Sequence, residues 1–392
     1  MRQLLFFLLL SLAAPSFSQQ ASIMNQGGSQ EKNYYTELQY KNVRDKIIVE
    51  ARIGQRNCRF IVDTGAPTTI TASLHQELGL AIMDRIPIQD ANGGIDSLMV
   101  SKIPAIALGG VSFLDIPTLV AHDSFLFDCL QVDGFIGSNL LRQSIVRLLP
   151  KTSQLILTDQ LQRLSLDKKQ AIPMQLNKVQ SSPYISVRAK GKKSASITLL
   201  FDLGMEGLFD LALRHYTMLE QEKIFTDITQ TLGSGSLGLH GRGKDTLQYR
   251  LTLPQLLISK ATLSNVSVQT TPADNSRIGA GLLAYGSVTL DYRHQQFYFE
   301  PFKPIHVLAN EHFPIAVTLQ DSKLVIASVW QEGLRDKLQV DDQVLSIDDI
   351  DYSNVDPCSF FVNKKVFADK QQALVTVKKA DGSIQAVAVC KE

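Results

Sequence analysis

The middle of the chain contains two stretches that repeat each other. Residues 59–66 read RFIVDTGA and residues 199–205 read LLFDLGM, so both are apolar, strand-like runs that end in Asp-x-Gly. Further along, residues 133–158 align without a gap onto residues 275–300, at a shift of 142 positions. Because self-similarity over this length indicates a duplicated structural unit, the sequence predicts two units of the same design.

The two copies also have nearly the same length. Asp63 and Gly137 are 74 positions apart, and Asp202 and Gly279 are 77 positions apart. Each copy therefore opens with a strand and Asp-x-Gly and closes with an apolar residue, Gly, two residues and Leu-Leu. The residues that recur in the closing segments are Ile136, Gly137, Leu140, Leu141, Val146, Leu148 and Gln154, which return as Ile278, Gly279, Leu282, Leu283, Val288, Leu290 and Gln296.

Short strand patterns dominate both copies. Several runs alternate apolar and polar residues, and Gly and Asn mark the turns between them. Helical patterns are short and fall at 72–78 and 138–142. Such a chain predicts a mainly β fold in which each copy forms an antiparallel barrel or sandwich, with a cleft between the two copies. Strands are expected at 47–53, 103–108, 116–120, 182–187 and 251–258.

The Asp-Thr-Gly sequence at 63–65 is suited to catalysis by a carboxylate. Gly65 accepts backbone angles that other residues resist, and the hydroxyl of Thr64 can fasten the turn. The tripeptide also occurs in ordinary β-turns, but its strand context and its copy at Asp202 favour a catalytic pair. Two adjacent carboxylates share a proton, so one can act as a general base on water while the other donates a proton to a carbonyl oxygen. The pair titrates together, so neither role is assigned to one residue.

Three motifs lie in order between residues 46 and 158: VDTGAPTTI, the Gly-Gly turn at 109–110 and VDGFIGSNLL. Together they resemble the retropepsin-like aspartic proteases, and the second copy looks like a diverged version of the same unit. The resemblance implies two tandem β-barrel lobes in a bilobal aspartic-protease fold. It implies a water-activating pair, Asp63 and Asp202, on turns supported by Thr64, Gly65 and Gly204. It further implies a polypeptide substrate and neither a metal nor an organic cofactor.

The resemblance also implies a glycine-rich β-hairpin flap over the substrate. Candidate flaps fall in corresponding places, at 89–96 and at 231–243. A flap of this kind would exclude water and hold an extended peptide by backbone pairing, although both stretches also fit ordinary surface hairpins. The flap candidates are Asn92, Gly93 and Gly94 in the first stretch and Gly233 and Gly235 in the second.

The second Asp-x-Gly departs from the family pattern. Leu203 stands where the first copy has Thr64, and Glu206 stands where the first copy has Pro67. The hydroxyl that would brace the second turn is therefore missing, and one such hydrogen bond is worth about 1 kcal/mol. Two functions follow as alternatives: an active aspartic endopeptidase, or a catalytically weak or inactive protease-like scaffold that only binds peptides. A site shared between two chains, each contributing Asp63, is disfavoured because the second copy already fills the partner's position.

The pattern changes after Pro301. Strands are expected at 315–319 and 324–329, a helix near 359–367, and a closing hairpin turned at 381–382. Residues 329–349 resemble a bacterial PDZ domain, except that Asp341 stands where that family usually has Gly. The likeness implies a PDZ-like α+β domain that binds a peptide or protein, but Pro314 removes one donor from the expected carboxylate-binding loop. A small docking domain is the alternative.

The N-terminus has the pattern of an export signal. Arg2 precedes an apolar run at 4–12, and small residues follow up to Ser18, whereas a membrane anchor would need about 20 apolar residues. Export to the periplasm or the extracellular space is therefore expected, with no integral membrane segment after signal removal. The expected organisation is a signal peptide at 1–18, a flexible lead-in at 19–37, a first lobe at 38–160, a second lobe at 161–303 and the PDZ-like domain at 304–392.

Charge and cysteine content narrow the remaining possibilities. The formal net charge of +1 gives no indication of a nucleic-acid partner. An exported chain can oxidise its cysteines, so the sequence allows either two disulfides or four buried thiols and does not assign pairs. The seven histidines are scattered and form no cluster with cysteine, so no zinc site is predicted. The cysteines are Cys58, Cys129, Cys358 and Cys390.

Overall fold

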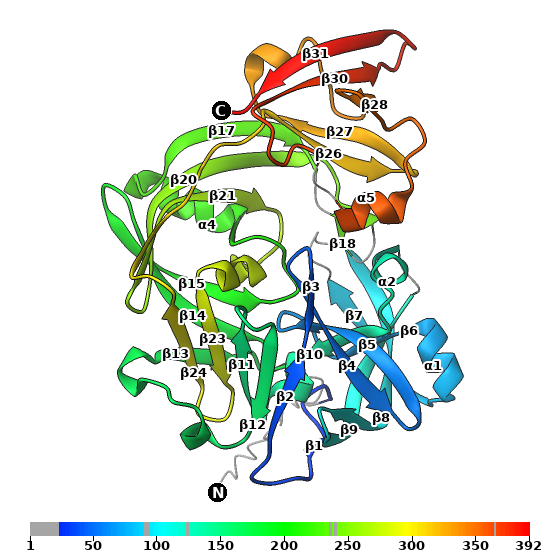
Figure 1. Cartoon of the computed structure of the whole chain (residues 1–392), viewed down its shortest axis with the longest axis vertical. Helices are drawn as coiled ribbons and strands as arrows, with labels where there is room; N and C mark the ends of the chain where they lie inside the picture. Colours follow the sequence, from blue (N-terminus) through cyan, green and yellow to red (C-terminus); the bar gives the residue numbers. More distant parts are fainter. Residues whose placement is uncertain (1–22, 90–93, 123–124, 235–236, 239–240, 364–365) are drawn as a thin grey trace, which may run out of the picture.

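The computed structural model describes residues 23–89, 94–122, 125–234, 237–238, 241–363 and 366–392. The protein is mainly β and contains closed β-barrels, as the strand patterns predict. Figure 1 shows the strands of the first half on the right, those of the second half on the left, and the C-terminal strands above both. No helix in the described part of the chain is long and apolar enough to cross a membrane.

The elements follow one another with short connections. Up to residue 160 they are β1 (Gly28–Ser29), β2 (Tyr35–Gln39), β3 (Lys41–Val43), β4 (Lys46–Ile53), β5 (Arg56–Asp63), β6 (Thr69–Thr71), α1 (Ala72–Leu78), β7 (Ile82–Gln89), β8 (Ile95–Leu108), β9 (Val111–Ala121), α2 (Phe125–Leu130), β10 (Gly134–Gly137), α3 (Ser138–Leu141), β11 (Ile145–Leu149) and β12 (Gln154–Thr158). From 161 to 308 they are η2 (Leu161–Arg163), η3 (Lys168–Gln170), β13 (Ile172–Leu176), β14 (Pro183–Lys190), β15 (Ser194–Asp202), β16 (Phe209–Ala212), α4 (Leu213–Leu219), η4 (Glu220–Glu222), β17 (Thr226–Gly233), β18 (Leu237–Gly238), β19 (Gly241–Arg242), β20 (Thr246–Ile258), β21 (Ala261–Thr271), β22 (Arg277–Gly279), η5 (Ala280–Ala284), β23 (Gly286–Asp291), β24 (Gln296–Pro301) and β25 (Ile305–Val307). The remaining elements are β26 (Ile315–Gln320), β27 (Lys323–Val329), η6 (Glu332–Leu334), β28 (Gln343–Ile347), β29 (Ile350–Asp351), α5 (Pro357–Asn363), β30 (Gln372–Lys378) and β31 (Ile384–Cys390).

A six-stranded antiparallel sheet joins the two halves, in the order β2, β12, β11, β23, β24, β13. At its centre Arg147 pairs with Thr289, and these are equivalent positions of the sequence repeat. On either side, Val146 pairs with Leu290 and Leu148 pairs with Val288. The pairing is therefore unchanged when the two copies are exchanged, so a local pseudo-twofold axis passes between β11 and β23.

The predicted short helices form where expected. Helix α1 begins after Thr71, whose hydroxyl accepts a hydrogen bond from the N–H of Leu74 at 3.2 Å. It ends at Gly79, which adopts the left-handed conformation that favours glycine. Local sequence therefore determines both ends of this helix.

The two largest hydrophobic clusters are separate from each other. The larger runs from Tyr34 to Phe299 and includes apolar side chains from both copies. The second runs from Phe313 to Val389 and belongs to the C-terminal elements alone. A smaller cluster packs Phe361 of the C-terminal part against first-copy side chains that include Phe127 and Phe135. The two copies thus share one core, and the C-terminal part has its own core and an apolar contact with the first copy.

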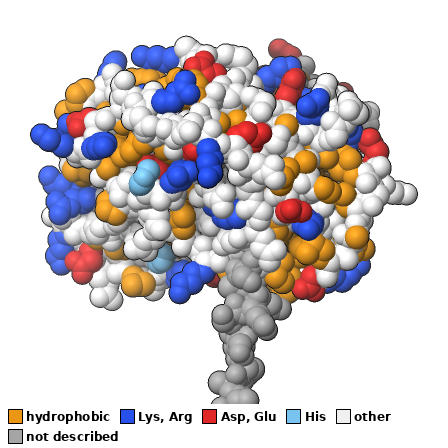
Figure 2. All heavy atoms as spheres, turned by 90° about the horizontal axis from the view of Figure 1, so that it is seen from below, with side chains coloured by type: hydrophobic (Ala, Val, Ile, Leu, Met, Phe, Trp, Pro, Cys, Tyr) orange, Lys and Arg blue, Asp and Glu red, His pale blue; other side chains and the backbone are white. Residues whose placement is uncertain are grey.

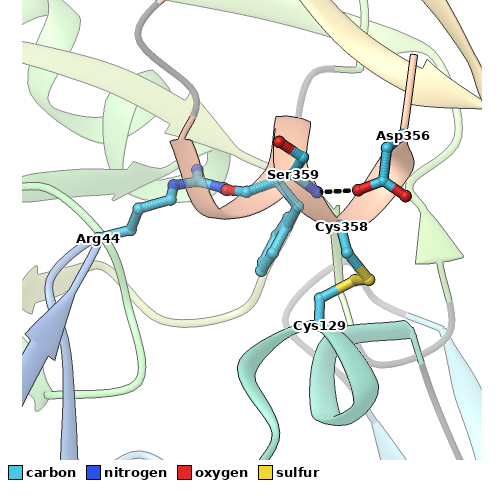
Figure 3. Close-up of a disulfide and its surroundings, with 6 residues drawn as sticks. Arg44, Cys129, Asp356, Cys358 and Ser359 are labelled. Carbon is cyan, nitrogen blue, oxygen red and sulfur yellow. Dashed lines mark hydrogen bonds between the residues drawn. A yellow bond between two sulfur atoms is a disulfide. The ribbon is translucent and has the colours of Figure 1, made fainter. Parts of the chain in front are cut away.

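The C-terminal elements are also fastened to the rest of the chain. A disulfide joins Cys129 in α2 to Cys358 in α5 (Figure 3), whereas Cys58 is buried and free and Cys390 is exposed and free. Both cysteine arrangements considered from the sequence, two disulfides or four thiols, are therefore wrong. Only one pair of the four is brought within bonding distance, because α2 and α5 pack against each other across 229 residues of sequence.

Arg44 makes a second connection to α5. Its guanidinium donates to the backbone carbonyl of Phe361 and lies over the ring of that residue, 4.6 Å from the centroid. The same guanidinium forms an ion pair with Glu206 at 2.6 Å. Arg44 therefore links α5 to the segment that follows Asp202.

The surface carries charges of both signs. Figure 2 shows one face of the molecule, on which Lys and Arg side chains lie among Asp and Glu side chains and exposed hydrophobic ones. This mixture is in line with the formal net charge of +1.

Candidate active site

Equivalent strand ends carry the two predicted aspartates. Asp63 ends β5, which pairs in parallel with β10, so that Asp63 lies opposite Gly137. Asp202 ends β15, which pairs in parallel with β22, so that Asp202 lies opposite Gly279. The repeated glycine of each closing segment therefore lies beside the aspartate of the same copy.

The two Asp-x-Gly turns interlock. A Cβ atom built on Gly65 would lie 2.6 Å from the carboxylate of Asp202, and one built on Gly204 would lie 2.2 Å from Oδ2 of Asp63. A Cβ atom does not approach a non-bonded atom so closely, so only glycine allows each turn to meet the opposite carboxylate. The structure thus brings Asp63, Asp202, Gly65 and Gly204 together, although the two aspartates are far apart in sequence.

Thr64 joins the two turns with its side chain. Its hydroxyl donates to the backbone carbonyl of Phe201 at 2.6 Å and accepts from the N–H of Leu203 at 3.0 Å. Thr64 and Leu203 are both fully buried. The hydrocarbon side chain of Leu203 cannot make equivalent hydrogen bonds to the first turn, and it packs in the shared core instead. The bracing between the turns is therefore one-sided, in agreement with the departure noted in the sequence.

The glycine carbonyls are held by side chains of the opposite copy. Gln180 donates to the carbonyl of Gly65 at 2.8 Å, and Ser182 donates to the same oxygen at 3.3 Å. In the other direction, Nζ of Lys46 donates to the carbonyl of Gly204. Since Lys46 belongs to the first copy and Gln180 to the second, each copy stabilises the turn of the other.

Backbone N–H groups orient both carboxylates. Oδ1 of Asp63 accepts from Gly65 at 2.9 Å and Ala66 at 3.0 Å, and Oδ1 of Asp202 accepts from Gly204 at 2.9 Å. Burial raises the pKa of Asp63 most, and the negative charge of Asp202 raises it further, from 3.8 to about 7. The positive charge of Lys46 and the two N–H groups lower this pKa, but by less. Asp63 therefore holds a proton under acidic conditions, as expected of one member of a carboxylate pair.

Arg277 adds a positive charge that the sequence analysis missed. Its Nη1 lies 3.6 Å from Oδ2 of Asp202, and its Nη2 lies 2.9 Å from Oδ2 of Asp210. The repeat alignment contained a signal for it, because Arg277 replaces Phe135 of the first copy directly before the shared Ile-Gly. The two sides of the site thus differ in charge as well as in bracing.

Polar residues of the first closing segment were also missed. The side chain of Asn139 accepts from the N–H and the hydroxyl of Thr68, at 2.7 and 2.8 Å, and donates to the carbonyls of Met24 and Pro117. Asn139 is fully buried, and its four hydrogen bonds join the chain just after Asp63, at Thr68, to the backbone at Met24 and Pro117. Gly281 replaces Asn139 in the second copy, so comparison of the repeats reveals this residue only as a difference.

Ser138 connects this support to the second copy. Its hydroxyl donates to the carbonyl of Thr64 at 2.8 Å and shares a hydrogen bond of 2.9 Å with the hydroxyl of Tyr292. Tyr292 follows β23 and is buried. A polar chain therefore runs from the second copy to the backbone of the first turn.

The flap candidates lie mostly outside the described residues. Asn92 and Gly93 fall there, between β7 and β8, and so does Gly235. Gly94 is described and precedes β8. Gly233 ends β17, where it pairs with Ser328 of β27, so the base of the second flap stretch lies against the C-terminal elements.

In the described residues, no group of three or more His, Cys, Asp and Glu side chains is arranged to hold a metal ion.

Residues 49–140 match the family model described as Aspartyl protease. This segment contains Asp63, Thr64, Gly65 and Gly137 and ends before Asp202. No curated protein matches the chain. The family match supports a protease-like function for the fold around Asp63.

Proposed function

We propose that this protein is an exported aspartic endopeptidase in which Asp63 and Asp202 form one catalytic pair. The proposal treats the two copies as tandem retropepsin-like lobes, each contributing one aspartate. One observation supports it above all: the carboxylate of each aspartate lies against the glycine of the opposite Asp-x-Gly turn. An arrangement in which only glycine fits on both sides is hard to explain unless the two carboxylates act together.

The proposed reaction needs no group beyond the pair and a water molecule. The ionised carboxylate takes a proton from water as its oxygen bonds to the peptide carbonyl carbon, and the protonated carboxyl donates its proton to the carbonyl oxygen. The tetrahedral intermediate then loses the amine, which receives a proton from the carboxyl that accepted it in the first step, while one hydroxyl of the intermediate returns a proton to the carboxylate that donated it in the first step. The pair returns to its starting state with one proton, and the peptide bond is hydrolysed.

A pair of Asp→Asn variants tests this mechanism. Asp63→Asn and Asp202→Asn should each lower cleavage of an unfolded polypeptide by at least about a thousandfold, because each removes one half of the acid-base pair. Cleavage should be measured against a peptide library from acid to mildly alkaline pH. Asp381→Asn is the matched control, since Asp381 lies in the turn between β30 and β31 and is fully exposed.

The outcomes separate the alternatives. A wild-type protein that cleaves nothing across the library and the pH range would exclude the endopeptidase. A variant of Asp202 with undiminished activity would instead favour a site in which two chains each supply Asp63.

The alternative function is a peptide-binding scaffold that uses the same cleft without cleavage. Leu203 favours it, because the turn that carries Asp202 lacks the hydroxyl found at Thr64. A scaffold would bind extended peptides from the library with unchanged affinity in the Asp63→Asn variant. An enzyme would bind them and, in the wild type only, release two products.

The proposal extends to location and to the C-terminal domain. Export to the periplasm or the extracellular space is inferred from residues 1–18, which lie outside the described residues. Residues 304–392 are proposed to form a PDZ-like domain that binds a peptide or protein ligand. Its independent apolar core, from Phe313 to Val389, is consistent with a separate domain.

A further inference from the structure

We infer that Arg277 holds the negative charge of the carboxylate pair on Asp202, so that Asp202 is the general base and Asp63 the proton donor. The inference rests on the proposed pair and adds to it an assignment of roles. Arg277 is a positioning residue in this scheme, because it acts on the reaction only through Asp202.

The geometry favours an effect on Asp202 rather than on both carboxylates. Nη1 of Arg277 is 3.6 Å from Oδ2 of Asp202, and both side chains are nearly buried, with exposed fractions of 12% and 10%. A positive charge at this distance stabilises the ionised form of a carboxyl group. Among the described residues, Arg277 forms ion pairs with Asp202 and Asp210 but not with Asp63, whose charge raises the pKa of Arg277 less than theirs do.

The first copy offers no counterpart. At the position equivalent to Arg277, Phe135 pairs with Ile61 and packs against Phe127, with ring centroids 5.2 Å apart. These side chains belong to an apolar cluster. The two copies therefore differ at this position: Phe135 of the first copy packs in an apolar cluster, whereas the guanidinium of Arg277 in the second copy lies beside Asp202.

The other charged groups near the pair do not offset the effect of the positive charge beside Asp202. Lys46 lowers the pKa of Asp63, but burial and the Asp202 charge outweigh it, so Asp63 remains the carboxyl with the raised pKa. Burial weakens the tendency of Arg277 to stay charged, yet Asp210 and Asp202 outweigh this and raise its pKa. The groups that face the two carboxylates are Lys46 from β4, Tyr184 from β14, Asp210 from β16, Arg277 from β22 and Tyr292 after β23.

The two tyrosines add no charge beside the carboxylates at acidic or neutral pH. Burial raises the pKa of Tyr184 and of Tyr292, so both stay neutral. Asp210 is the one nearby group that shares Arg277 with Asp202, since its Oδ2 lies 2.9 Å from Nη2. It therefore provides a control that changes the charge around Arg277 without removing the guanidinium.

The direct test is a carbon NMR titration of the full chain labelled at the aspartate carboxyl carbons. Asp63→Asn and Asp202→Asn identify the two signals. In the wild type, Asp202 should ionise at lower pH than Asp63. Because this measurement needs neither substrate nor an Arg277 variant, the reverse order would overturn the inference even if every Arg277 variant failed to fold.

Variants then test the cause. Arg277→Phe introduces the residue of the first copy and removes the positive charge beside Asp202, so the acidic limb of the kcat/KM profile should move to higher pH, by about 1 to 3 pH units. Arg277→Lys should restore most of the wild-type position. Asp210→Asn should move the acidic limb in the opposite direction, because the guanidinium then acts on Asp202 alone.

A purely structural role for Arg277 would change all three variants alike, by lowering kcat without shifting the profile, and would overturn the inference. The proposed function can fail independently. If the titration gives the expected order but no peptide is cleaved, the endopeptidase is excluded while the assignment of charge stands. If peptides are cleaved and Arg277→Phe leaves both the titration and the profile unchanged, the inference alone is wrong.

Discussion

The two Asp-x-Gly turns are unequal partners. Thr64 supplies a hydroxyl that both donates to and accepts from the second turn, whereas Leu203 supplies only apolar contact. Lys46 and Gln180 hold the glycine carbonyls from opposite sides. The position of each carboxylate therefore depends on residues of both copies, and a single side chain carries most of the direct bracing.

Thr64 is accordingly expected to be sensitive to loss of its hydroxyl. Thr64→Val keeps the shape but leaves the carbonyl of Phe201 and the N–H of Leu203 buried without a partner, which costs about 1 to 3 kcal/mol of unfolding free energy. Peptide cleavage should fall as the turns lose their relative position. Urea unfolding and kcat measure the two effects, and Thr64→Ser, which keeps the hydroxyl, should retain more of both. Equal stability of the Val and Ser variants would contradict this role.

The raised pKa of Asp63 predicts a pH-dependent stability difference. The folded state holds the proton of Asp63 up to about pH 7, whereas the unfolded state releases it near pH 4. Ionisation in the folded state is therefore unfavourable, and this cost is absent below about pH 4, grows between pH 4 and 7 and is constant above. Asp63→Asn should thus gain stability over the wild type as the pH rises, by about 4 kcal/mol at most.

Urea unfolding at several pH values from 4 to 8 measures this difference. Asp381→Asn is the control, because hydrogen bonds from the side chain and backbone of Ser383 lower the pKa of Asp381, so its difference from the wild type should stay nearly constant above about pH 5. A constant difference between Asp63→Asn and the wild type over this range would show that Asp63 titrates normally.

At the level of elements, the base of the second flap stretch is attached to the C-terminal strands. Gly233 pairs with Ser328, and the hydroxyl of Thr231 donates to the carbonyl of Val329 at 2.8 Å. Arg242 in β19 forms an ion pair with Asp341 at 2.6 Å and also donates to Gln320. Movement of this stretch is therefore coupled to β26 and β27.

Arg242→Ala should loosen that attachment. The variant loses its hydrogen bonds to Asp341, Gln320 and the carbonyl of Ser234, and a net loss of about 1 kcal/mol corresponds to roughly fivefold faster amide exchange. Hydrogen exchange of peptides from β17 and β20 measures the effect. Lys244→Ala is the control, since Lys244 is exposed in the same connection. Unchanged exchange in both variants would mean that backbone pairing alone holds the stretch.

For the molecule as a whole, the disulfide joins two parts whose largest hydrophobic clusters are separate. Cys129 lies in the first half and Cys358 in the C-terminal part, which buries its own apolar residues. Arg44 adds a polar connection from α5 to Glu206. The C-terminal part is therefore attached to both copies at once.

Removal of the disulfide should destabilise the protein. A crosslink that closes a long loop restricts the unfolded chain, so Cys129→Ser should lower the unfolding free energy by about 2 to 5 kcal/mol. Denaturant unfolding with and without a reductant measures this, and the reductant should have no further effect on the variant. Cys390→Ser is the control, because Cys390 is exposed and free. A wild type that is equally stable in a reductant would contradict a stabilising disulfide.

The sequence predicted the parts of the fold that depend on neighbouring residues. Thr71 and Gly79 mark both ends of α1, and the strands expected in both copies match strands of the structure, with the one expected at 182–187 beginning one residue before β14. The helix expected near 359–367 forms at Pro357–Asn363, because Asp356 caps it earlier, by accepting from the N–H of Ser359 at 2.6 Å (Figure 3). The cysteine pair could not be predicted, since it depends on the packing of α2 against α5.

By itself, the sequence determined where the two Asp-x-Gly turns lie, that they belong to a repeat, and that the second lacks a hydroxyl. These properties depend only on residues that are neighbours along a strand and its turn. Only the tertiary structure decided that Gly65 meets Asp202, that Gly204 meets Asp63 and that Arg277 lies beside one carboxylate. Such contacts join residues that are far apart in the chain. They form only when β11 pairs with β23 and the two copies pack into one shared core, so no pattern of neighbouring residues predicts them.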